Sequence, residues 1–139
     1  MTLQRASLHI VALATLLFAA DIAWAQEDAQ KLRIPATVRG VIGGESHDSY
    51  VVRARAGQIM TVQISWRREH DEEWVDINGN NFAQFWIGEL SDYGANPVEF
   101  GKESNKGKRW SGKIPRTGNY YIYVTAFPIA RYTLRVTVK

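Results

Sequence analysis

Few side chains in this sequence could act as an acid, a base or a nucleophile, and they are scattered along the chain. His47 and His70 both stand among turn-forming polar residues, and no serine occupies the Gly-x-Ser-x-Gly elbow of a hydrolase. The chain has no cysteine, so it offers neither a thiolate nucleophile nor a thiolate ligand for zinc. We therefore predict no catalytic residues and interpret the protein as a binding protein, not an enzyme.

Acidic residues cluster in one charged stretch, 67–76, which has no periodic apolar face and is predicted to be an exposed loop. A glycosidase needs two carboxyl groups about 5 to 9.5 Å apart across a cleft. Glu72, Glu73 and Asp76 are close in sequence, but nothing in their spacing places two of them across a cleft. A small hydrolase that uses these loop carboxylates stays an alternative hypothesis.

The segment 76–80 resembles part of a calcium-binding loop, because oxygen-bearing side chains follow one another on a tight turn. The fuller pattern fails at Asn81, where a loop glycine belongs, and at Ile87, where a bidentate acid belongs. The Asn-Gly pair within the segment also predicts a plain hairpin. His47 and His70 each precede an aspartate but have no further ligand at useful spacing. We predict no metal and no cofactor, with a calcium-dependent matrix-binding module as an alternative.

The elements that must position these residues are predicted to be strands, because apolar and polar residues alternate with period two between Gly, Pro and Asn turns. About eight short strands are expected, at 36–42, 49–56, 59–66, 82–90, 98–102, 108–114, 120–126 and 131–139. With no amphipathic helix, this pattern predicts an all-β fold: a two-sheet, antiparallel, jelly-roll-like β-sandwich. The expected core comprises Met60, Val62, Ile64, Tyr120, Ile122, Val124, Leu134 and Val136.

Aromatic residues divide by strand parity into a core set and a set that could lie on exposed faces. The second set is Tyr121, Tyr123, Trp74, Trp86, Tyr93 and Trp110. Exposed aromatic rings flanked by Arg or Lys suit a protein-binding hot spot or a sugar-stacking platform. Burial in a core that lacks disulfides would also explain them. A carbohydrate-binding module is therefore a further alternative.

The first residues have the pattern of an export signal: Arg5, then an apolar run over 10–20, then the small-x-small site Ala23-Trp24-Ala25. We predict a signal peptide at 1–25, a flexible lead-in at 26–33 and one β-sandwich domain at 34–139. No later apolar run approaches the roughly 18 residues of a transmembrane helix, so no transmembrane segment is expected. The predicted location is periplasmic or secreted.

The net charge of +3 is mild, and it is unchanged without the leader, which contains one base and one acid. Such an excess is compatible with an anionic partner, for example a cell-wall polymer or an acidic protein surface. The basic residues alternate along strands instead of forming a block, so no nucleic-acid partner is expected.

Two spaced motifs carry a resemblance to a known family. The first is Tyr50-x-x-x-Ala54-x-Ala56-Gly57-Gln58-x-x-x-Val62-x-Ile64, and the second is Ile114-Pro115-x-x-Gly118-x-Tyr120-x-Ile122-x-Val124. Together they resemble the bacterial pre-peptidase C-terminal β-sandwich domain and, within that group, the periplasmic inhibitors of goose-type lysozyme. The resemblance covers 34–139.

The resemblance implies a protein partner, a lysozyme whose substrate cleft is blocked by loops at one end of the sandwich. In this sequence His47, Asp48 and Tyr50 match the approach to the second strand. Phe127 belongs to the last hairpin, 126–130, which is short and apolar, and Arg131 directly follows it. We expect a partner to contact the loops around His47 and Phe127 and not the charged stretch at 67–73.

We predict that the exported protein begins at residue 26, because the leader has a basic start, an apolar centre and a small-x-small end. Mass spectrometry of protein isolated from its native cell envelope measures the N-terminus directly. Mature material that retains Met1 would contradict the prediction.

Overall fold

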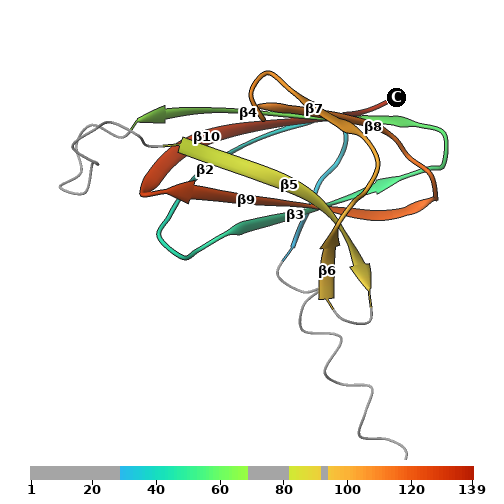
Figure 1. The fold of residues 1–139 in the computed structure, drawn as a ribbon, viewed down its shortest axis with the longest axis horizontal. Helices are drawn as coiled ribbons and strands as arrows, with labels where there is room; N and C mark the ends of the chain where they lie inside the picture. Colours follow the sequence, from blue (N-terminus) through green and yellow to red (C-terminus); the bar gives the residue numbers. More distant parts are fainter. Residues whose placement is uncertain (1–28, 69–81, 92–93) are drawn as a thin grey trace, which may run out of the picture.

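The computed structural model describes residues 29–68, 82–91 and 94–139, and the regular elements in these ranges are all strands (Figure 1). They are β1 (Gln30–Lys31), β2 (Ala36–Gly43), β3 (Asp48–Ala54), β4 (Ile59–Arg68), β5 (Phe82–Ser91), β6 (Gly94–Pro97), β7 (Lys102–Ser104), β8 (Arg109–Lys113), β9 (Gly118–Phe127) and β10 (Ile129–Val138). No helix that could cross a membrane occurs in the described part of the chain. The predicted all-β class is confirmed.

The strands form two five-stranded sheets that face each other (Figure 1). The first sheet has the order β1-β3-β9-β5-β6, and the second has the order β2-β10-β4-β8-β7. Neighbouring strands are antiparallel except for β1 and β3, which run parallel. The pairs β2–β3, β4–β5 and β9–β10 are consecutive in the chain but lie in different sheets. The predicted two-sheet sandwich is confirmed, with ten strands where about eight were expected.

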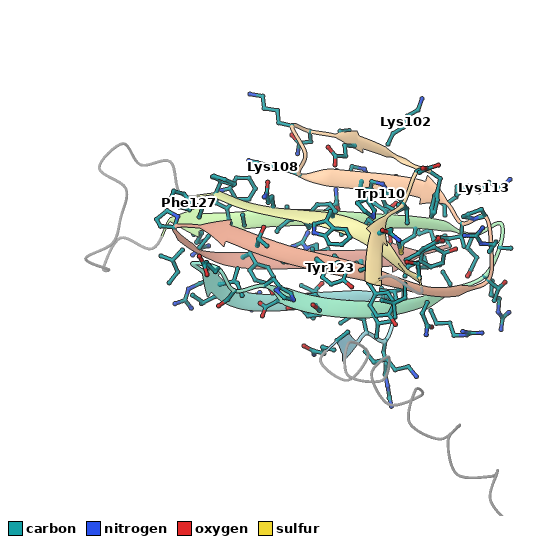
Figure 2. The ribbon with its side chains drawn as sticks, turned by 60° about the horizontal axis from the view of Figure 1, so that its bottom comes forward. Lys102, Lys108, Trp110, Lys113, Tyr123 and Phe127 are labelled. Carbon is teal, nitrogen blue, oxygen red and sulfur yellow. The ribbon has the colours of Figure 1, made fainter. Side chains whose placement is uncertain are left out.

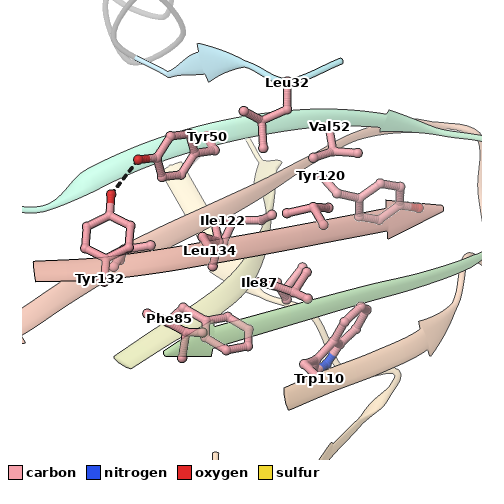
Figure 3. Packing of buried hydrophobic residues seen from close by; sticks show 14 of the residues in the cluster. Leu32, Tyr50, Val52, Phe85, Ile87, Trp110, Tyr120, Ile122, Tyr132 and Leu134 are labelled. Carbon is pink, nitrogen blue, oxygen red and sulfur yellow. Dashed lines mark hydrogen bonds between the residues drawn. The ribbon is translucent and has the colours of Figure 1, made fainter. Parts of the chain in front are cut away.

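The apolar half of each alternating strand fills the space between the sheets (Figure 3). In the second sheet, Leu134 lies opposite Ile64 and Val136 opposite Val62. In the first sheet, Ile122 lies between Tyr50 and Ile87. All eight residues predicted for the core are buried. Because the chain has no cysteine for disulfides, burial of this apolar surface is the main source of its stability.

The segment 94–102 differs from the prediction. A loop was expected at Gly94–Pro97, but these residues form edge strand β6, paired with β5. A strand was expected at 98–102, but only Lys102 belongs to one, β7. The apolar side chain of Phe100 suggested a strand there. In the structure Phe100 lies in irregular backbone, and its ring packs edge-on against those of Trp110 and Tyr120, at centroid distances of 5.7 and 5.9 Å.

Trp110, one of the aromatics assigned to exposed positions, is buried. Its place opposite buried Val62 in the β4–β8 ladder turns the indole inward. Gly101 and Gly112 make room for the ring, since a Cβ at either position would lie 2.4 or 2.6 Å from an indole carbon. The prediction for Trp110 was wrong because parity within β8 does not say which face meets the other sheet.

The N-terminal residues 29–33, placed in a flexible lead-in, are part of the sandwich instead. β1 pairs with Tyr50 and Val51 of β3, and the Leu32 amide donates to the Val51 carbonyl at 2.9 Å. Leu32 is buried in the core cluster. A single apolar side chain in a polar segment gave no periodic signal, which is why this short edge strand was missed.

The last hairpin, 126–130, is not a hairpin in the hydrogen-bonded sense. β9 belongs to the first sheet and β10 to the second, so the turn at Phe127–Pro128 carries the chain from one sheet to the other. Both strands alternate apolar residues, and a tight connection between two such strands looks the same in sequence whether or not they pair.

Several predictions fall outside the described residues. They are the signal peptide at 1–25, the hairpin turn at Asn78-Gly79, the acids at 71–76, and the aromatics Trp74 and Tyr93.

Replacing Ile122 by alanine should lower the free energy of unfolding by about 2 to 5 kcal/mol, because a fully buried aliphatic side chain leaves a cavity. The matched control is Ile59→Ala at a position 51% exposed, where the same change should cost less than about 1 kcal/mol. Urea unfolding measures both. Equal costs would mean that β9 presents its other face to the core.

Candidate functional site

Two connections meet at one end of the sandwich. The loop 44–47 joins β2 to β3, and the turn at Phe127–Pro128 joins β9 to β10. The Gly44 amide donates to the Pro128 carbonyl at 2.9 Å, and Gly43 lies opposite Ile129 in the β2–β10 ladder. A Cβ at Gly43 would lie 2.4 Å from the Pro128 carbonyl oxygen, so only glycine allows this approach. We call the loop 44–47 and residues 127–129 the Phe127 end.

The apolar part of the Phe127 end is a pair of phenylalanines. Phe127 closes β9 and lies opposite Phe82, the first residue of β5, with ring centroids 6.4 Å apart. The two side chains are 59% and 40% exposed, which is unusual for rings of this size in a well-packed sandwich. Figure 2 shows Phe127 at the tip of the molecule, beyond the ends of the sheets. The pair offers a partner an apolar contact surface.

The described residues on either side of 69–81 lie at this same end of the sandwich. Arg68, the last residue of β4, lies opposite Ala130, and Phe82 lies opposite Phe127. The Phe127 turn and the charged stretch are predicted to be separate surfaces, and the stretch beyond Arg68 lies outside the described residues.

A hydrogen-bonded chain of three side chains ties the two sheets together beneath this end, and Figure 3 shows its link between Tyr50 and Tyr132. Tyr132 of β10 donates to the Asp48 carboxylate of β3, with 2.5 Å between the oxygens. The Tyr50 hydroxyl is hydrogen-bonded to that of Tyr132. Gly40 of β2 makes room for this ring, since a Cβ there would lie 2.7 Å from the Tyr132 hydroxyl. The chain fixes the start of β3, and with it the loop 44–47.

Burial is the main cause of the raised pKa of both tyrosines. For Tyr132, which is 1% exposed, the hydrogen bonds to Asp48 and Tyr50 raise the pKa further. For Tyr50, burial and the charge of Asp48 raise the pKa, while its hydrogen bond with Tyr132 lowers it. Both hydroxyls therefore keep their protons at neutral pH: Tyr132 donates to the Asp48 carboxylate, and Tyr50 donates to the Tyr132 hydroxyl.

An aromatic row runs from the Phe127 end along the outer face of the first sheet. Trp86 stacks on Tyr123 with ring centroids 4.2 Å apart, and His47 and Tyr121 lie 6.1 and 6.3 Å from Tyr123. Gly88 leaves room for the indole, because a Cβ there would lie 2.6 Å from it. Burial, and next the neighbouring Tyr121, raise the pKa of Tyr123. We call these four residues the aromatic row.

The aromatic row is less exposed than its sequence predicted. Tyr121 is 4% exposed, whereas an exposed position was possible by parity. Its ring does lie on the outer face with that of Tyr123, opposite Val51 and Gly88. Neighbouring side chains cover its ring. The alternation of residues along a strand predicts on which face a side chain lies, but not whether its neighbours cover it. Trp86 and Tyr123 are half-buried.

The structure brings three of the five predicted site residues together at one hollow. His47 is exposed, Asp48 is half-buried, and both line a shallow hollow with Gln30, Ser49 and Tyr50. Tyr50 is 5% exposed, so its hydroxyl acts on Asp48 through Tyr132 and not at the surface.

The other two predicted residues lie on different sides of the turn. Phe127 is at the tip, whereas Arg131 is exposed on the outer face of the second sheet, opposite Val41 and Arg67. Arg131 therefore borders the Phe127 end without lining the hollow at His47.

Two features of this site are not among the predicted site residues: the side chain of Phe82 and the hydroxyl of Tyr132. A tyrosine in place of an aliphatic residue on a core face is the available signal, because a buried phenol needs a hydrogen-bond partner. The place of Phe82 at the surface depends on the pairing of β5 with β9 at Phe127. No pattern in the sequence around Phe82 indicates that pairing.

The described side chains at this end are of the kinds that contact a binding partner. No group of three or more His, Asp or Glu residues within 29–68, 82–91 and 94–139 lies close enough to hold a metal ion. His47, the histidine in these ranges, contacts Tyr123 through its ring, and Asp48 is engaged by Tyr132. The site therefore presents an apolar tip, an imidazole and a fixed carboxylate. The acids of the hydrolase and calcium alternatives lie outside these ranges.

Comparisons with known proteins bear on the fold. No protein-family model and no curated protein matches the sequence. Among solved structures, PliG of Aeromonas hydrophila, a periplasmic lysozyme inhibitor of g-type lysozyme, has 19% identity and a TM-score of 0.57 over 80% of this chain and 96% of that chain. PliG of Salmonella Typhimurium, described in the same words, has 21% identity and a TM-score of 0.51 over 81% and 99%.

A third similar structure comes from the other group that the motifs resemble. The pre-peptidase C-terminal domain of collagenase from Bacillus anthracis has 18% identity and a TM-score of 0.50 over 78% of this chain and 94% of that chain. At such identities the likeness establishes a shared fold. The predicted resemblance to these two groups of sandwiches is confirmed at that level.

Replacing Tyr132 by phenylalanine should make stability less sensitive to alkali. Below the ordinary tyrosine pKa of about 10 the folded and unfolded chains both keep this proton. Above it the unfolded chain loses the proton while buried Tyr132 retains it, so the free energy of unfolding falls by about 1.4 kcal/mol per pH unit.

Urea unfolding from pH 9 upward measures this slope in both proteins. Above pH 10 the free energy of unfolding should fall less steeply in the variant, by about 1.4 kcal/mol per pH unit. At pH 7 the variant should be less stable by about 1 to 2 kcal/mol, because it lacks the hydrogen bond of the Tyr132 hydroxyl. Identical alkaline slopes would contradict the buried position of the hydroxyl.

Proposed function

We propose that this chain is an exported, non-catalytic binding module of the lysozyme-inhibitor type, which blocks an enzyme cleft with its Phe127 end. The observation that carries the proposal is the exposed Phe127–Phe82 pair at the tip of an otherwise well-buried sandwich. An apolar ring that protrudes between polar neighbours is the usual anchor of a protein interface. The shared fold with periplasmic lysozyme inhibitors supports the choice of partner.

Rigidity of the Phe127 end supports tight binding. The turn is bonded to Gly44, and the loop that follows Gly44 leads into Asp48, which Tyr132 holds from the opposite sheet. A tip fixed before binding loses less conformational entropy when a partner orders it. The Phe127 end therefore suits insertion into a cleft better than a free loop would.

The charges near the tip suit an acidic cleft. Glycosidases hold two carboxyl groups at the centre of their clefts. Arg131 and Arg67 lie opposite each other on the second sheet next to the turn, and His47 lies at the edge of the first sheet. Cationic side chains around an apolar anchor give the electrostatic complementarity that fixes orientation and speeds association.

The aromatic row gives less support to the carbohydrate-binding alternative. A sugar-stacking platform needs an open ring face, whereas Trp86 and Tyr123 stack on each other with 17° between their planes. Each ring thus covers one face of the other. This arrangement fits a packed sheet surface better than a sugar platform.

Replacing Phe127 by alanine should weaken binding to a susceptible lysozyme by at least tenfold, about 1.4 kcal/mol, because the change removes the anchor of the contact. Goose-type, chicken-type and invertebrate-type lysozymes are tested in turn. Affinity is measured by calorimetry, and inhibition by clearing of a cell-wall suspension. The matched control is Ile59→Ala, which removes a similarly exposed apolar side chain on a face of the second sheet away from the turn.

Two outcomes count against the proposal in different ways. If no lysozyme is bound or inhibited by the unchanged protein, the lysozyme-inhibitor function is wrong. If a lysozyme is inhibited but Phe127→Ala binds as tightly as Ile59→Ala, the inhibitor function stands and the Phe127 end is not the contact.

A further inference from the structure

The outer face of the second sheet carries cations and hydroxyls and no acid among its described residues. In β2, β10, β4 and β8 every second side chain is directed away from the core, as the alternating burial shows. In β7, Lys102 and Ser104 lie on that side because they are opposite Ser111 and Arg109 of β8. The residues that point outward are Thr37, Arg39, Val41, Arg131, Thr133, Arg135, Thr137, Ile59, Thr61, Gln63, Ser65, Arg67, Arg109, Ser111, Lys113, Lys102 and Ser104.

Five of these cations lie away from the Phe127 end. They are Arg39, Lys102, Arg109, Lys113 and Arg135, and we call them the cationic face. Arg109 is half-buried and the other four are exposed. Lys102 and Lys113 extend away from the body of the sandwich in Figure 2.

The strand register spreads the cationic face over the full width of the sheet. Arg135 lies opposite Thr37, next to Arg39 on the diagonal, and Gln63 separates it from Arg109 in the same row. Lys102 lies opposite Ser111, and Ser111 stands between Arg109 and Lys113 on the same side of β8. From β2 to β7 the sheet spans four strand spacings, about 19 Å. The charges therefore form a two-dimensional field and not a line.

The acids nearest to this field point elsewhere. Glu103 lies opposite buried Trp110 in the β7–β8 ladder, so it belongs to the other side of edge strand β7. Glu89 belongs to β5 in the first sheet, where it pairs with Arg116 at 2.9 Å. Soluble proteins normally intersperse both signs of charge, and like charges on neighbouring strands destabilise a sheet. Fold stability does not explain a face of one sign.

We infer that the cationic face docks on an anionic lipid surface. A broad, gently twisted sheet face has no trench to guide a single polymer chain, but it can lie against a plane of negative headgroups. Each Lys or Arg close to such a plane adds electrostatic attraction, and hydroxyls between them can donate to phosphate oxygens. Val41 and Ile59, 49% and 51% exposed, add apolar contact at opposite ends of the same face.

Docking in this way leaves the Phe127 end accessible. The turn lies at the ends of the strands, whereas the cationic face is the flat side of the second sheet. A protein lying on this side exposes its tip parallel to the membrane plane. The inference is independent of the proposed lysozyme contact, since the two use different residues.

Co-sedimentation with vesicles tests the inference. One set contains phosphatidylglycerol and phosphatidylcholine in equal parts, and the other contains phosphatidylcholine alone. The protein should bind the anionic vesicles at low ionic strength, at least tenfold more strongly than the neutral ones. Raising the salt to near molar concentration should abolish the difference, because screening shortens the reach of exposed charges to about 3 Å.

Two triple variants separate this face from net charge. The test variant carries Arg39→Gln, Arg109→Gln and Arg135→Gln, and it should lose at least tenfold in binding to the anionic vesicles. The control carries Arg53→Gln, Arg55→Gln and Arg116→Gln, which removes the same charge from exposed positions outside the second sheet, and it should keep most of the binding. If the test variant does not fold by circular dichroism, Lys102→Gln with Lys113→Gln replaces it.

Three outcomes would overturn the inference. The first is equal binding to anionic and neutral vesicles. The second is an equal loss in the test and control variants, which would reduce the effect to net charge. The third is binding to a soluble polyanion such as heparin, with no binding to anionic vesicles, which would assign the face to an anionic polymer.

Discussion

The crossing from β9 to β10 at Phe127–Pro128 is the constraint on which the rest of the sandwich depends. β9 pairs with β3 and β5 in the first sheet, and β10 pairs with β2 and β4 in the second, so each strand forms ladders on both sides. Because a tight turn joins them, the two sheets are held face to face at this end. Gly43 and Gly44 complete the junction, since the neighbouring backbone leaves no room for a Cβ at Gly43.

Polar groups beneath the junction follow from its geometry. Two tyrosines enter the core from opposite sheets, and a buried phenol without a partner would be destabilising. Asp48 supplies that partner at the first residue of β3, where the loop 44–47 ends. The same contacts that satisfy the core thus fix a surface loop. This coupling explains how a chain without disulfides can present a rigid tip.

The two sheets have different outer faces. The first carries stacked aromatic rings, Trp86 on Tyr123 with His47 and Tyr121 beside them. The second carries basic and hydroxyl side chains, and the described residues that point out of it include no acid. The mild net charge of +3 for the chain does not reveal this difference, since a sum over all residues says nothing of which face carries each charge. The proposed recognition roles depend on this distribution and not on the total charge.

The sequence by itself determined the fold class and the inward residues, because period-two alternation and turn residues are local properties of each strand. Met60, Ile122 and Leu134 could be assigned to the core on that basis. Only the tertiary structure decided which strands are neighbours, and with it the burial of Trp110, the Tyr132–Asp48 contact and the pairing of Phe127 with Phe82. The cationic face was hidden for the same reason, since its residues come from strands far apart in the chain. Register and sheet order are set by long-range packing, which alternation within a strand does not encode.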